Sequence, residues 1–299
     1  MTAPAPDARR IPSAPTPSWS VVGRLVRIRN QTGTLLLLLP SLWALVLAAQ
    51  GLPSWRLVLL FSLGSFLMRS AGVVLNDLAD RSFDRHVART KERPLASGEL
   101  SPAQALLVLA LLLALAAVLV CFLNTTTILL SPIALLLAAL YPFAKRFIHV
   151  PQAMLGVAFG WGTIMAWTAS RGTLDVPAWF VFAATICWAI GYDTVYAMQD
   201  RDDDRRIGVK SSALFFGSSV WLAVGISLTT MVALVGIAGW LMQIGWFFYG
   251  TLAAVSLFCF RQAVLLRRPV SPAQAFSMFQ QHVWIGVALL AGLIGGFVL

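Results

Sequence analysis

Two dense clusters of acidic residues each follow a long apolar run. The first occupies Asn76–Asp84 and the second Asp200–Asp204, and together they hold more than half of the chain's 12 acidic residues. Moving a carboxylate into hydrocarbon costs about 2.5–3.5 kcal/mol on insertion scales, so acids at the ends of apolar segments mark a functional site by default. Two such clusters suggest one shared site that binds cations.

The apolar runs predict an integral membrane protein. The chain is 59% hydrophobic and 11% charged, with a mean hydropathy of +0.80, which excludes an ordinary soluble domain. A spanning helix needs roughly 20 predominantly apolar residues. Residues 1–23 are predicted to be a flexible cytoplasmic tail without a cleavable signal peptide, and residues 24–299 a single transmembrane domain. Nine spans are predicted, at residues 32–49, 56–76, 104–123, 126–143, 152–170, 178–196, 219–241, 243–260 and 281–298.

The basic residues predict the orientation of these spans. Of the 22 Lys and Arg residues, 19 lie before the first span or after the second, fourth, sixth and eighth. The other connections are short and almost uncharged. The positive-inside rule therefore predicts a cytoplasmic N-terminus and a C-terminus on the opposite side. The net charge of +10 follows from this topology, with some attraction to anionic lipids, so no nucleic-acid binding is expected.

Several other classes of site find no support in the chain. Cys121, Cys187 and Cys259 lie far apart within apolar runs and are predicted to be core residues, because no disulfide or zinc spacing is present. The three histidines are also scattered and are expected at the membrane interface. There is no GxxxxGK[ST] or GxGxxG string, so a nucleotide-driven pump is not indicated. No protein partner is predicted.

The first acidic cluster predicts a set of ligands on one helix face. Asn76, Asp80 and Asp84 are spaced i, i+4 and i+8, so on a helix they face the same way. Two turns span roughly 12 Å, which leaves room for more than one metal ion. For Asp77, Asp202 and either Asp203 or Asp204, a solvated position that balances nearby arginines is an equal alternative to a functional role.

The second cluster repeats the pattern. Residues recur here at intervals of three or four and are expected along one face: Tyr192 or Asp193, Tyr196, Asp200, and Asp203 or Asp204. Hard oxygen ligands in this number suit Mg²⁺, which usually takes one or two carboxylates, waters and phosphate oxygens. A diphosphate held between Mg²⁺ ions from the two clusters would satisfy both the acids and the ligand. Polar stretches at residues 85–101 and 205–217 could form caps over such a cavity.

Three basic residues are candidates for binding an anionic substrate. Arg69 lies inside the second span, near the face that carries Asn76. Its side chain could extend to the cytoplasmic head groups, about one and a half turns away, but partnering an anion in the cavity is favoured. Lys145 and Arg146 follow Tyr141 at the cytoplasmic end of the fourth span. They either anchor that end to the membrane surface or bind a diphosphate or a substrate carboxylate, for which a planar Arg fork is suited.

At these residues the chain resembles the UbiA-type membrane prenyltransferases. Their first signature, N-D-x-x-D-x-x-x-D, corresponds to Asn76–Asp84, and their second Asp-rich motif to Tyr192–Asp204. The likeness covers about residues 24–217, with one departure at Gln31–Gly33, where the 4-hydroxybenzoate polyprenyltransferase branch often has Pro-Ile-Gly. Longer runs similar to that branch are residues 83–90, 93–98, 140–146 and 207–211.

The resemblance implies an all-α bundle of nine transmembrane helices around a central cavity, with cytoplasmic cap loops after helices 2 and 6. It implies Mg²⁺-dependent transfer of a polyprenyl group from its diphosphate to 4-hydroxybenzoate, ortho to the hydroxyl, in ubiquinone synthesis. Diphosphate is released. Under this hypothesis the metal ligands are Asn76, Asp80, Asp84, Asp200 and Asp204, of which the four aspartates are catalytic. The expected substrate-binding residues are Arg69, Tyr141, Lys145, Arg146, Asp193 and Tyr196, with Asp193 or the diphosphate itself accepting the ring proton.

Two alternatives stay open at this point. The acceptor could instead be a naphthoate, a homogentisate or a haem, because acceptor choice depends on cavity shape. A secondary transporter could also carry buried acids, but it would place them near the middle of the membrane. Here the acids lie at cytoplasmic ends, which favours the enzyme. The Ala- and Arg-rich composition favours a bacterial inner membrane.

Overall fold

The computed structural model describes residues 18–87, 89–208 and 210–299, and helices account for most of them. The all-α class is confirmed. The long helices are α2 (Thr32–Ala49), α3 (Trp55–Asp84), α5 (Pro102–Val120), α6 (Thr125–Leu140), α8 (Pro151–Arg171), α9 (Val176–Ala197), α12 (Val220–Leu241), α13 (Trp246–Leu265) and α14 (Pro272–Val298). The short elements are α1 (Trp19–Leu25), α4 (Pro94–Ser97), α7 (Ala144–Phe147), α10 (Arg201–Ile207), α11 (Ser212–Phe216) and the 3₁₀ turns η1 (Tyr141–Phe143), η2 (Met198–Asp200) and η3 (Gly217–Ser219).

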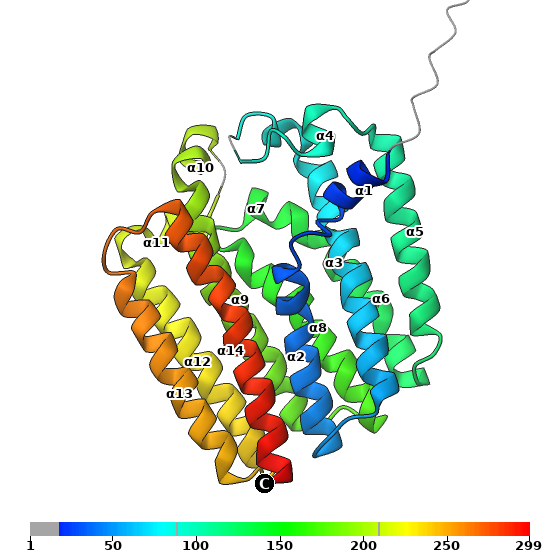
Figure 1. The fold of residues 1–299 in the computed structure, drawn as a ribbon, viewed down its shortest axis with the longest axis vertical. Coiled ribbons are helices and arrows are strands. Elements are labelled where there is room, and N and C mark those ends of the chain that lie inside the picture. Colours follow the sequence, from blue (N-terminus) through cyan, green and yellow to red (C-terminus); the bar gives the residue numbers. More distant parts are fainter. Residues whose placement is uncertain (1–17, 88, 209) are drawn as a thin grey trace, which may run out of the picture.

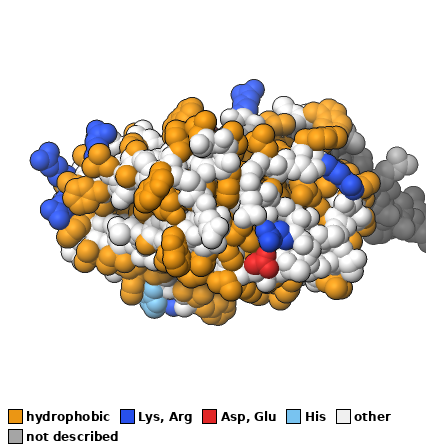
Figure 2. Space-filling view, turned by 90° about the horizontal axis from the view of Figure 1, so that it is seen from below, with side chains coloured by type: hydrophobic (Ala, Val, Ile, Leu, Met, Phe, Trp, Pro, Cys, Tyr) orange, Lys and Arg blue, Asp and Glu red, His pale blue; other side chains and the backbone are white. Residues whose placement is uncertain are grey.

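The long helices run side by side along one axis (Figure 1). The short elements α1, α4, α7 and α10 gather toward one end of the bundle, and the C-terminus lies at the other end. That far end is mainly hydrophobic or uncharged, with little acidic surface (Figure 2). Acidic side chains are therefore scarce at the end that holds the C-terminus, although some Lys and Arg side chains are visible around it.

Within the described residues, eight helical segments are long and apolar enough to cross a membrane. They correspond to eight of the nine predicted spans, including the segment at Trp246–Leu265. Four of them extend well beyond the predicted limits, namely Trp55–Asp84, Val176–Arg206, Ser212–Leu241 and Pro272–Val298. The second span continues through its acidic cluster to Asp84, and the last begins at Pro272. The helix thus carries Asn76, Asp80 and Asp84 out of the apolar region on one continuous axis.

The ninth predicted span corresponds to α8, which is not among the eight because small and polar residues dilute its apolar ones. Its composition follows from its place between α2, α6 and α9 in the bundle. A Cβ at Gly156 would lie 2.7 Å from the Ile186 Cα, and one at Gly160 would lie 2.9 Å from the Phe182 ring. Glycines at such positions let two helices approach closely inside a membrane protein. Close packing against α9 therefore explains the low hydropathy of α8.

Aromatic residues join α2, α9 and α14 in the core. The indole of Trp43 donates a hydrogen bond to the Gly286 carbonyl at 2.9 Å, and its ring lies 4.9 Å from that of Trp188. Trp188 in turn donates to His282 Nδ1 at 3.0 Å. The prediction that all histidines lie at the interface is therefore wrong for His282, which is fully buried and held by an indole.

The contact at Gly286 gives a test of this packing. A Cβ there would approach Leu39 Cδ1 to 2.6 Å and the Trp188 ring to 2.9 Å. Overpacking of a core costs about 1–3 kcal/mol, so we expect Gly286→Ala to lower the melting temperature in detergent by several degrees. Gly250→Ala is the matched control, since a Cβ there meets no atom within 4 Å. Equal melting temperatures for the two variants would contradict the packing described here.

Candidate active site

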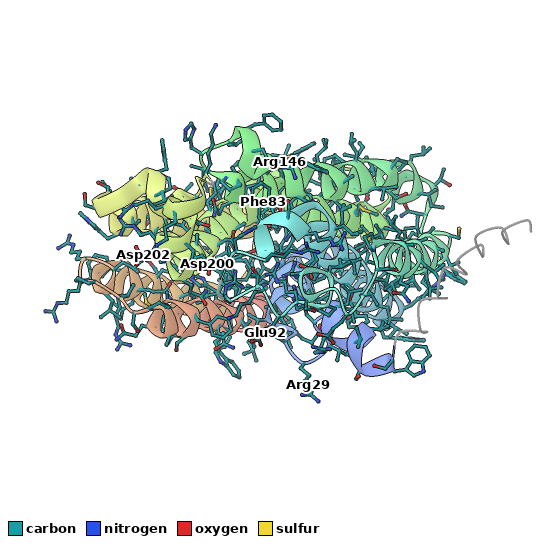
Figure 3. The ribbon with its side chains drawn as sticks, turned by 90° about the horizontal axis from the view of Figure 1, so that it is seen from above. Arg29, Phe83, Glu92, Arg146, Asp200 and Asp202 are labelled. Atoms are coloured by element: carbon teal, nitrogen blue, oxygen red, sulfur yellow. The ribbon has the colours of Figure 1, made fainter. Side chains whose placement is uncertain are left out.

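The two acidic clusters lie on one cavity at the polar end of the bundle. The cavity has a volume of about 560 Å³ and is lined by residues of α2, α3, α8, α9 and the segments that follow α3 and α9. Figure 3 views this end along the bundle, with Asp200 toward the centre and Arg29 pointing away from the molecule. The predicted site residues that line the cavity are Arg69, Asn76, Asp80, Asp84, Tyr141, Asp193, Tyr196, Asp200 and Asp204.

The first cluster reaches the cavity as predicted, from one face of an uninterrupted helix. The residues of α3 from Trp55 to Asp84 form 30 continuous helical positions, so Asn76, Asp80 and Asp84 stay on the same side. Asp80 is 2% exposed, although it lies close to the polar end of the helix. Carboxylates buried to this degree need compensating charge or hydrogen bonds in the cavity.

The second cluster reaches the cavity by a different route from the one predicted. The helix α9 ends at Ala197, and the 3₁₀ turn Met198–Asp200 precedes the short helix α10. A 3₁₀ turn advances three residues per turn, so the face shared by Asp193 and Tyr196 does not continue unbroken through Asp204. The helix is thus interrupted between Tyr196 and Asp204, although all four residues line the cavity. The tighter turn nevertheless brings Asp200 and Asp204 to the same cavity as Asp193.

Asp77 is held by two arginines. Arg27 Nη2 donates to both of its carboxylate oxygens at 2.9 Å, and Arg93 Nη1 donates to Oδ1 at 3.0 Å. Arg93 also donates to Asp84 Oδ2 at 2.9 Å. Burial lowers the pKa of Arg27, against the attraction of Asp77, yet a guanidinium stays charged at any physiological pH. Asp77 thus ties the N-terminal segment and the segment after α3 to the helix.

Arg89 binds Asp200 across the cavity. Its Nε donates to Asp200 Oδ1 at 2.8 Å, its Nη2 donates to Oδ2, and its Nη1 donates to the Tyr196 hydroxyl at 2.9 Å. The guanidinium also lies 5.4 Å from the centre of the Tyr196 ring. Burial alone would lower the pKa of Arg89, but the hydrogen bonds to Asp200 and the neighbouring negative charges raise it above its ordinary value. Arg89 and Asp200 thus form a bidentate ion pair, so the Asp200 carboxylate is neutralised by a protein cation without any ligand.

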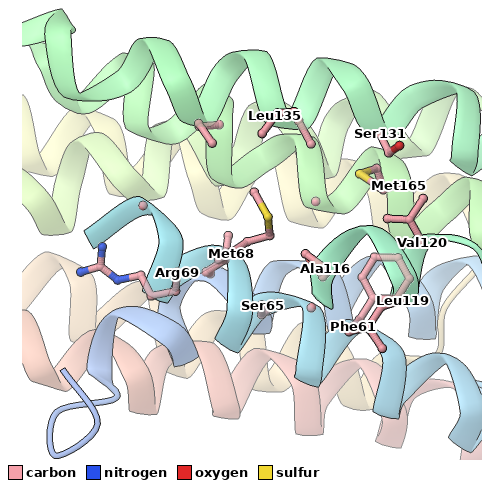
Figure 4. Close-up of a pocket in the computed structure, with 18 of the residues that line it drawn as sticks. Phe61, Ser65, Met68, Arg69, Ala116, Leu119, Val120, Ser131, Leu135 and Met165 are labelled. Atoms are coloured by element: carbon pink, nitrogen blue, oxygen red, sulfur yellow. The ribbon is translucent and has the colours of Figure 1, made fainter. Parts of the chain in front are cut away.

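Arg69 lies where the polar cavity meets a second, apolar one. The apolar cavity has a volume of about 390 Å³ and shares Arg69, Tyr141, Leu155 and Phe159 with the polar cavity. Figure 4 shows Arg69 at one end of it and Phe61, Leu119 and Val120 at the other. Its remaining lining comes mainly from leucine, alanine and glycine residues of α2, α3, α5, α6 and α8.

The Arg69 guanidinium packs against the glycine at the start of α2. A Cβ at Gly33 would lie 2.4 Å from Arg69 Nε and 2.6 Å from Nη2, so a larger residue there would require the guanidinium to shift.

Two predicted substrate-binding residues are not part of the described cavity lining. Arg146 Nη2 donates to the Ala79 carbonyl at 3.0 Å, and its guanidinium lies 5.2 Å from the centre of the Phe143 ring. The side chain of Lys145 lies outside the described part of the structure. Arg146 therefore contacts α3 at the residue before Asp80.

Three arginines that line the cavity are not among the predicted site residues. Arg27, Arg89 and Arg93 belong to the excess of positive charge expected on one side of the membrane, yet each pairs with an acid of the two motifs. Gln152, at the start of α8, also lines the cavity and is 4% exposed. The number of carboxylates in the two motifs is the signal that could have indicated these arginines, because carboxylates gathered in one small cavity require nearby cations.

The comparisons with known proteins agree with this geometry. Residues 37–297 match the sequence profile of the UbiA prenyltransferase family. The chain belongs to that family. It is 46% identical over 276 residues to the 4-hydroxybenzoate octaprenyltransferase of Vibrio parahaemolyticus, which covers 92% of this chain and 96% of the relative. It is 44% identical over 294 residues to that of Pseudomonas aeruginosa, covering 98% of this chain and 97% of the relative.

Solved structures of UbiA homologues have the same fold. The apo structure of the Aeropyrum pernix homologue matches with a TM-score of 0.75 at 25% identity, over 87% of this chain and 97% of that one. The Archaeoglobus fulgidus homologue bound to GPP and Mg²⁺ matches with a TM-score of 0.59 at 20% identity, over 92% of this chain and 99% of that one. The bundle is thus that of a UbiA-family protein.

The donor atoms of the polar cavity suit Mg²⁺ rather than a transition metal. Its lining offers carboxylate and amide oxygens, the hard ligands that Mg²⁺ prefers. Among the described residues, no three Asp, Glu, His or Cys side chains converge closely enough to form a complete metal cage. Mg²⁺ usually takes only one or two carboxylates and fills its shell with water and phosphate oxygens. The residues therefore fit a metal that binds together with a phosphorylated ligand.

The pairing of Asp77 gives a prediction that separates structural from functional acids. Asp77→Asn leaves Arg27 and Arg93 without their shared carboxylate, and loss of one partner from a buried ion pair costs about 3 kcal/mol. We expect a clearly lower melting temperature and near-normal activity per folded molecule. Asp203→Asn is the control, because Asp203 lies 3.9 Å from an exposed arginine, and surface pairs contribute little. Unchanged stability with lost activity would instead make Asp77 a ligand.

Proposed function

We propose that this protein transfers a polyprenyl group from polyprenyl diphosphate to 4-hydroxybenzoate, forming a bond at the ring carbon ortho to the hydroxyl and releasing diphosphate. Relatives named 4-hydroxybenzoate octaprenyltransferase, at 43–46% identity over more than nine-tenths of this chain, support this acceptor. The reaction belongs to ubiquinone synthesis. Polyprenyl diphosphate and the aromatic acid are its substrates.

The observation that carries the proposal is the junction of two unlike cavities. The acid-lined polar cavity and the apolar cavity share Arg69 and Tyr141. A prenyl diphosphate has the same division, with a polyanionic head and a hydrocarbon tail. The head would bind among the two acidic motifs, the tail would extend past Gly64, and the reacting carbon would lie near the junction.

Mg²⁺ would be held by Asn76, Asp80 and Asp84 on one side of the cavity and by Asp200 and Asp204 on the other. When bound, it supplies positive charge that turns diphosphate into a better leaving group and holds it in place. The Archaeoglobus fulgidus homologue of this fold was solved with GPP and Mg²⁺.

The protein's own residues would orient the two substrates and manage charge. Arg69 is positioned to bind an anionic group at the junction, either the diphosphate or the carboxylate of the acceptor. The faces of Tyr141 and Tyr196 would stabilise the allylic cation that forms as the carbon–oxygen bond breaks. The apolar walls exclude water, which would otherwise quench that cation. The ring carbon then attacks, and the Asp193 carboxylate takes the ring proton.

Lys145 and Arg146 would act from the edge of the site. Arg146 holds the carbonyl of Ala79 and so positions the stretch of α3 that carries Asp80. Arg146 would also add positive potential at this end of the bundle, and we propose the same for Lys145 from its place in the sequence. Such a potential favours the approach of an anionic substrate.

We propose further that α8 crosses the membrane, giving nine spans, although its composition is less apolar than that of the other eight. Helix α8 begins at the polar cavity with Pro151 and Gln152, and at its other end Thr168 accepts a hydrogen bond from Asn124. With nine spans, the basic connections share the cytoplasmic side with the N-terminus and the polar cavity, while the C-terminus lies opposite. Bacterial relatives support the inner membrane as the location.

The direct test is a membrane assay with 4-hydroxybenzoate and a polyprenyl diphosphate, run with Mg²⁺ and with EDTA. Prenylated acid that forms only with Mg²⁺ supports the proposal. Product formed from a naphthoate or homogentisate, but not from 4-hydroxybenzoate, would show that the acceptor is a different aromatic compound. If folded protein forms no product with any aromatic acceptor, prenyl transfer is refuted.

The motif residues yield a second prediction. Asp80→Ala and Asp200→Ala should each abolish turnover, at least a thousand-fold on the scale of about 4 kcal/mol lost from the transition state, while expression and melting temperature stay near wild type. Asp202→Ala is the control, because Asp202 is exposed and does not line the cavity. Near-normal turnover by either motif variant would remove that residue from the site.

The apolar cavity yields a third prediction. Gly64 lines it, and a Cβ there would meet no atom within 4 Å, so a larger side chain would project into open space. We expect Gly64→Leu to slow transfer from octaprenyl diphosphate about ten-fold and to leave a short geranyl donor nearly unaffected. Gly250→Leu, on the outer surface of α13, is the control. An equal loss with both donors would show that the tail does not pass Gly64.

A further inference from the structure

The starting observation is that Asp200 already has a partner. Arg89 binds both of its carboxylate oxygens and is anchored by the Tyr196 hydroxyl at 2.9 Å. The Arg89 side chain is 38% exposed and lines the polar cavity, on the segment that joins α3 to α4. A residue on a segment without regular secondary structure, partly exposed to the cavity, can change partner without disturbing a helix.

The charges of the cavity nearly cancel without any ligand. Among the described residues that line it, six carboxylates face five cationic side chains. The carboxylates are Asp77, Asp80, Asp84, Asp193, Asp200 and Asp204, and the cations are Arg27, Arg69, Arg89, Arg93 and Lys210. Arginine therefore does in the ligand-free cavity what a metal would do in the loaded one, namely neutralise the acids.

A metal ion on the Asp200 oxygens would compete with Arg89 for them, because the guanidinium binds both oxygens and carries the same sign of charge as the metal. A metal that arrives alone therefore weakens the bidentate pair, and Arg89 loses part of its charged partner. If a diphosphate arrives as well, the guanidinium gains new oxygens to bind, and planar forks bind phosphates as readily as carboxylates.

We propose that Arg89 is a diphosphate-binding residue that neutralises Asp200 in the metal-free cavity and moves to the diphosphate when metal binds. The inference rests on the proposed function and extends it to a residue outside both acidic motifs. Its consequence is that metal and diphosphate bind cooperatively. By linkage, diphosphate tightens metal binding by the same factor as metal tightens diphosphate binding.

Arg93 does not share this role. Its Nη1 bridges Asp77 and Asp84, and its side chain is 18% exposed against 38% for Arg89. Moving it would uncover Asp77, which is 1% exposed. Arg93 is therefore a fixed part of the cavity wall, and Arg89 is the cation that can be exchanged.

The test measures binding rather than turnover. Mn²⁺ replaces Mg²⁺, inorganic diphosphate replaces the substrate head, and free Mn²⁺ is followed by electron paramagnetic resonance with the purified full-length protein in detergent. In Arg89→Gln we expect Mn²⁺ alone to bind about ten-fold more tightly, because Asp200 is released. At saturating Mn²⁺, diphosphate should bind about ten-fold more weakly, so the cooperativity factor falls.

Arg85→Gln is the matched control. It lies on the same segment and donates to the Ala96 carbonyl at 3.1 Å, but it does not line the cavity. It should leave both affinities unchanged. Arg89→Lys keeps the positive charge but lacks the planar guanidinium, so it should change both affinities in the same directions by a smaller factor. This variant provides the test if Arg89→Gln does not fold.

Two results would overturn the inference. If Arg89→Gln leaves both affinities unchanged, Arg89 is not exchanged on binding. If metal and diphosphate affinities both weaken, Arg89 only supports the cavity wall. Neither result depends on the acceptor, so failure of the 4-hydroxybenzoate assay in the wild type would refute the proposed function separately.

Discussion

The rest of the structure depends on keeping several carboxylates together in a small cavity at one end of an apolar bundle. Each carboxylate is costly to remove from water, and each repels the others. The chain offsets this cost with arginines, two of which belong to the segment between α3 and α4 while another precedes α2. The polar segments that cover this end of the bundle therefore also supply its counter-charges. Without them the acidic motifs could not remain close enough to share one ligand.

Close packing between helices determines where these charged residues lie. The acids lie on α3 and just after α9, which are far apart in sequence, and α8 lies against both helices. Its glycines let α9 approach to backbone contact near Gly156, so the ends of α3 and α9 face one cavity. A similar steric relation holds at Gly33, where the missing side chain leaves room for the Arg69 guanidinium. Small residues thus determine where the charged ones lie.

Much of this could be predicted from the sequence. Long apolar runs and one-sided basic residues indicated the helices and the polar end, and the spacing of Asn76, Asp80 and Asp84 indicated a shared face, because α3 is regular throughout. The face after Asp193 could not be predicted, since a 3₁₀ turn replaces the helix at Met198–Asp200. The partners of Arg89 and Arg27 were also out of reach, because ion pairs between distant segments leave no local pattern. Helix α8 was expected by length, but its role as a closely packed helix became clear only from its neighbours.

The central claim is that both acidic motifs bind one diphosphate together. Calorimetric titration of the purified protein with inorganic diphosphate at saturating Mg²⁺ tests it most directly, with wild type, Asp80→Ala and Asp200→Ala compared. A shared site predicts one diphosphate per chain in the wild type, near-complete loss of binding in each variant, and little further loss in the double variant. Two diphosphates per chain, or one retained by each single variant, would show that the motifs form separate sites and would contradict the account.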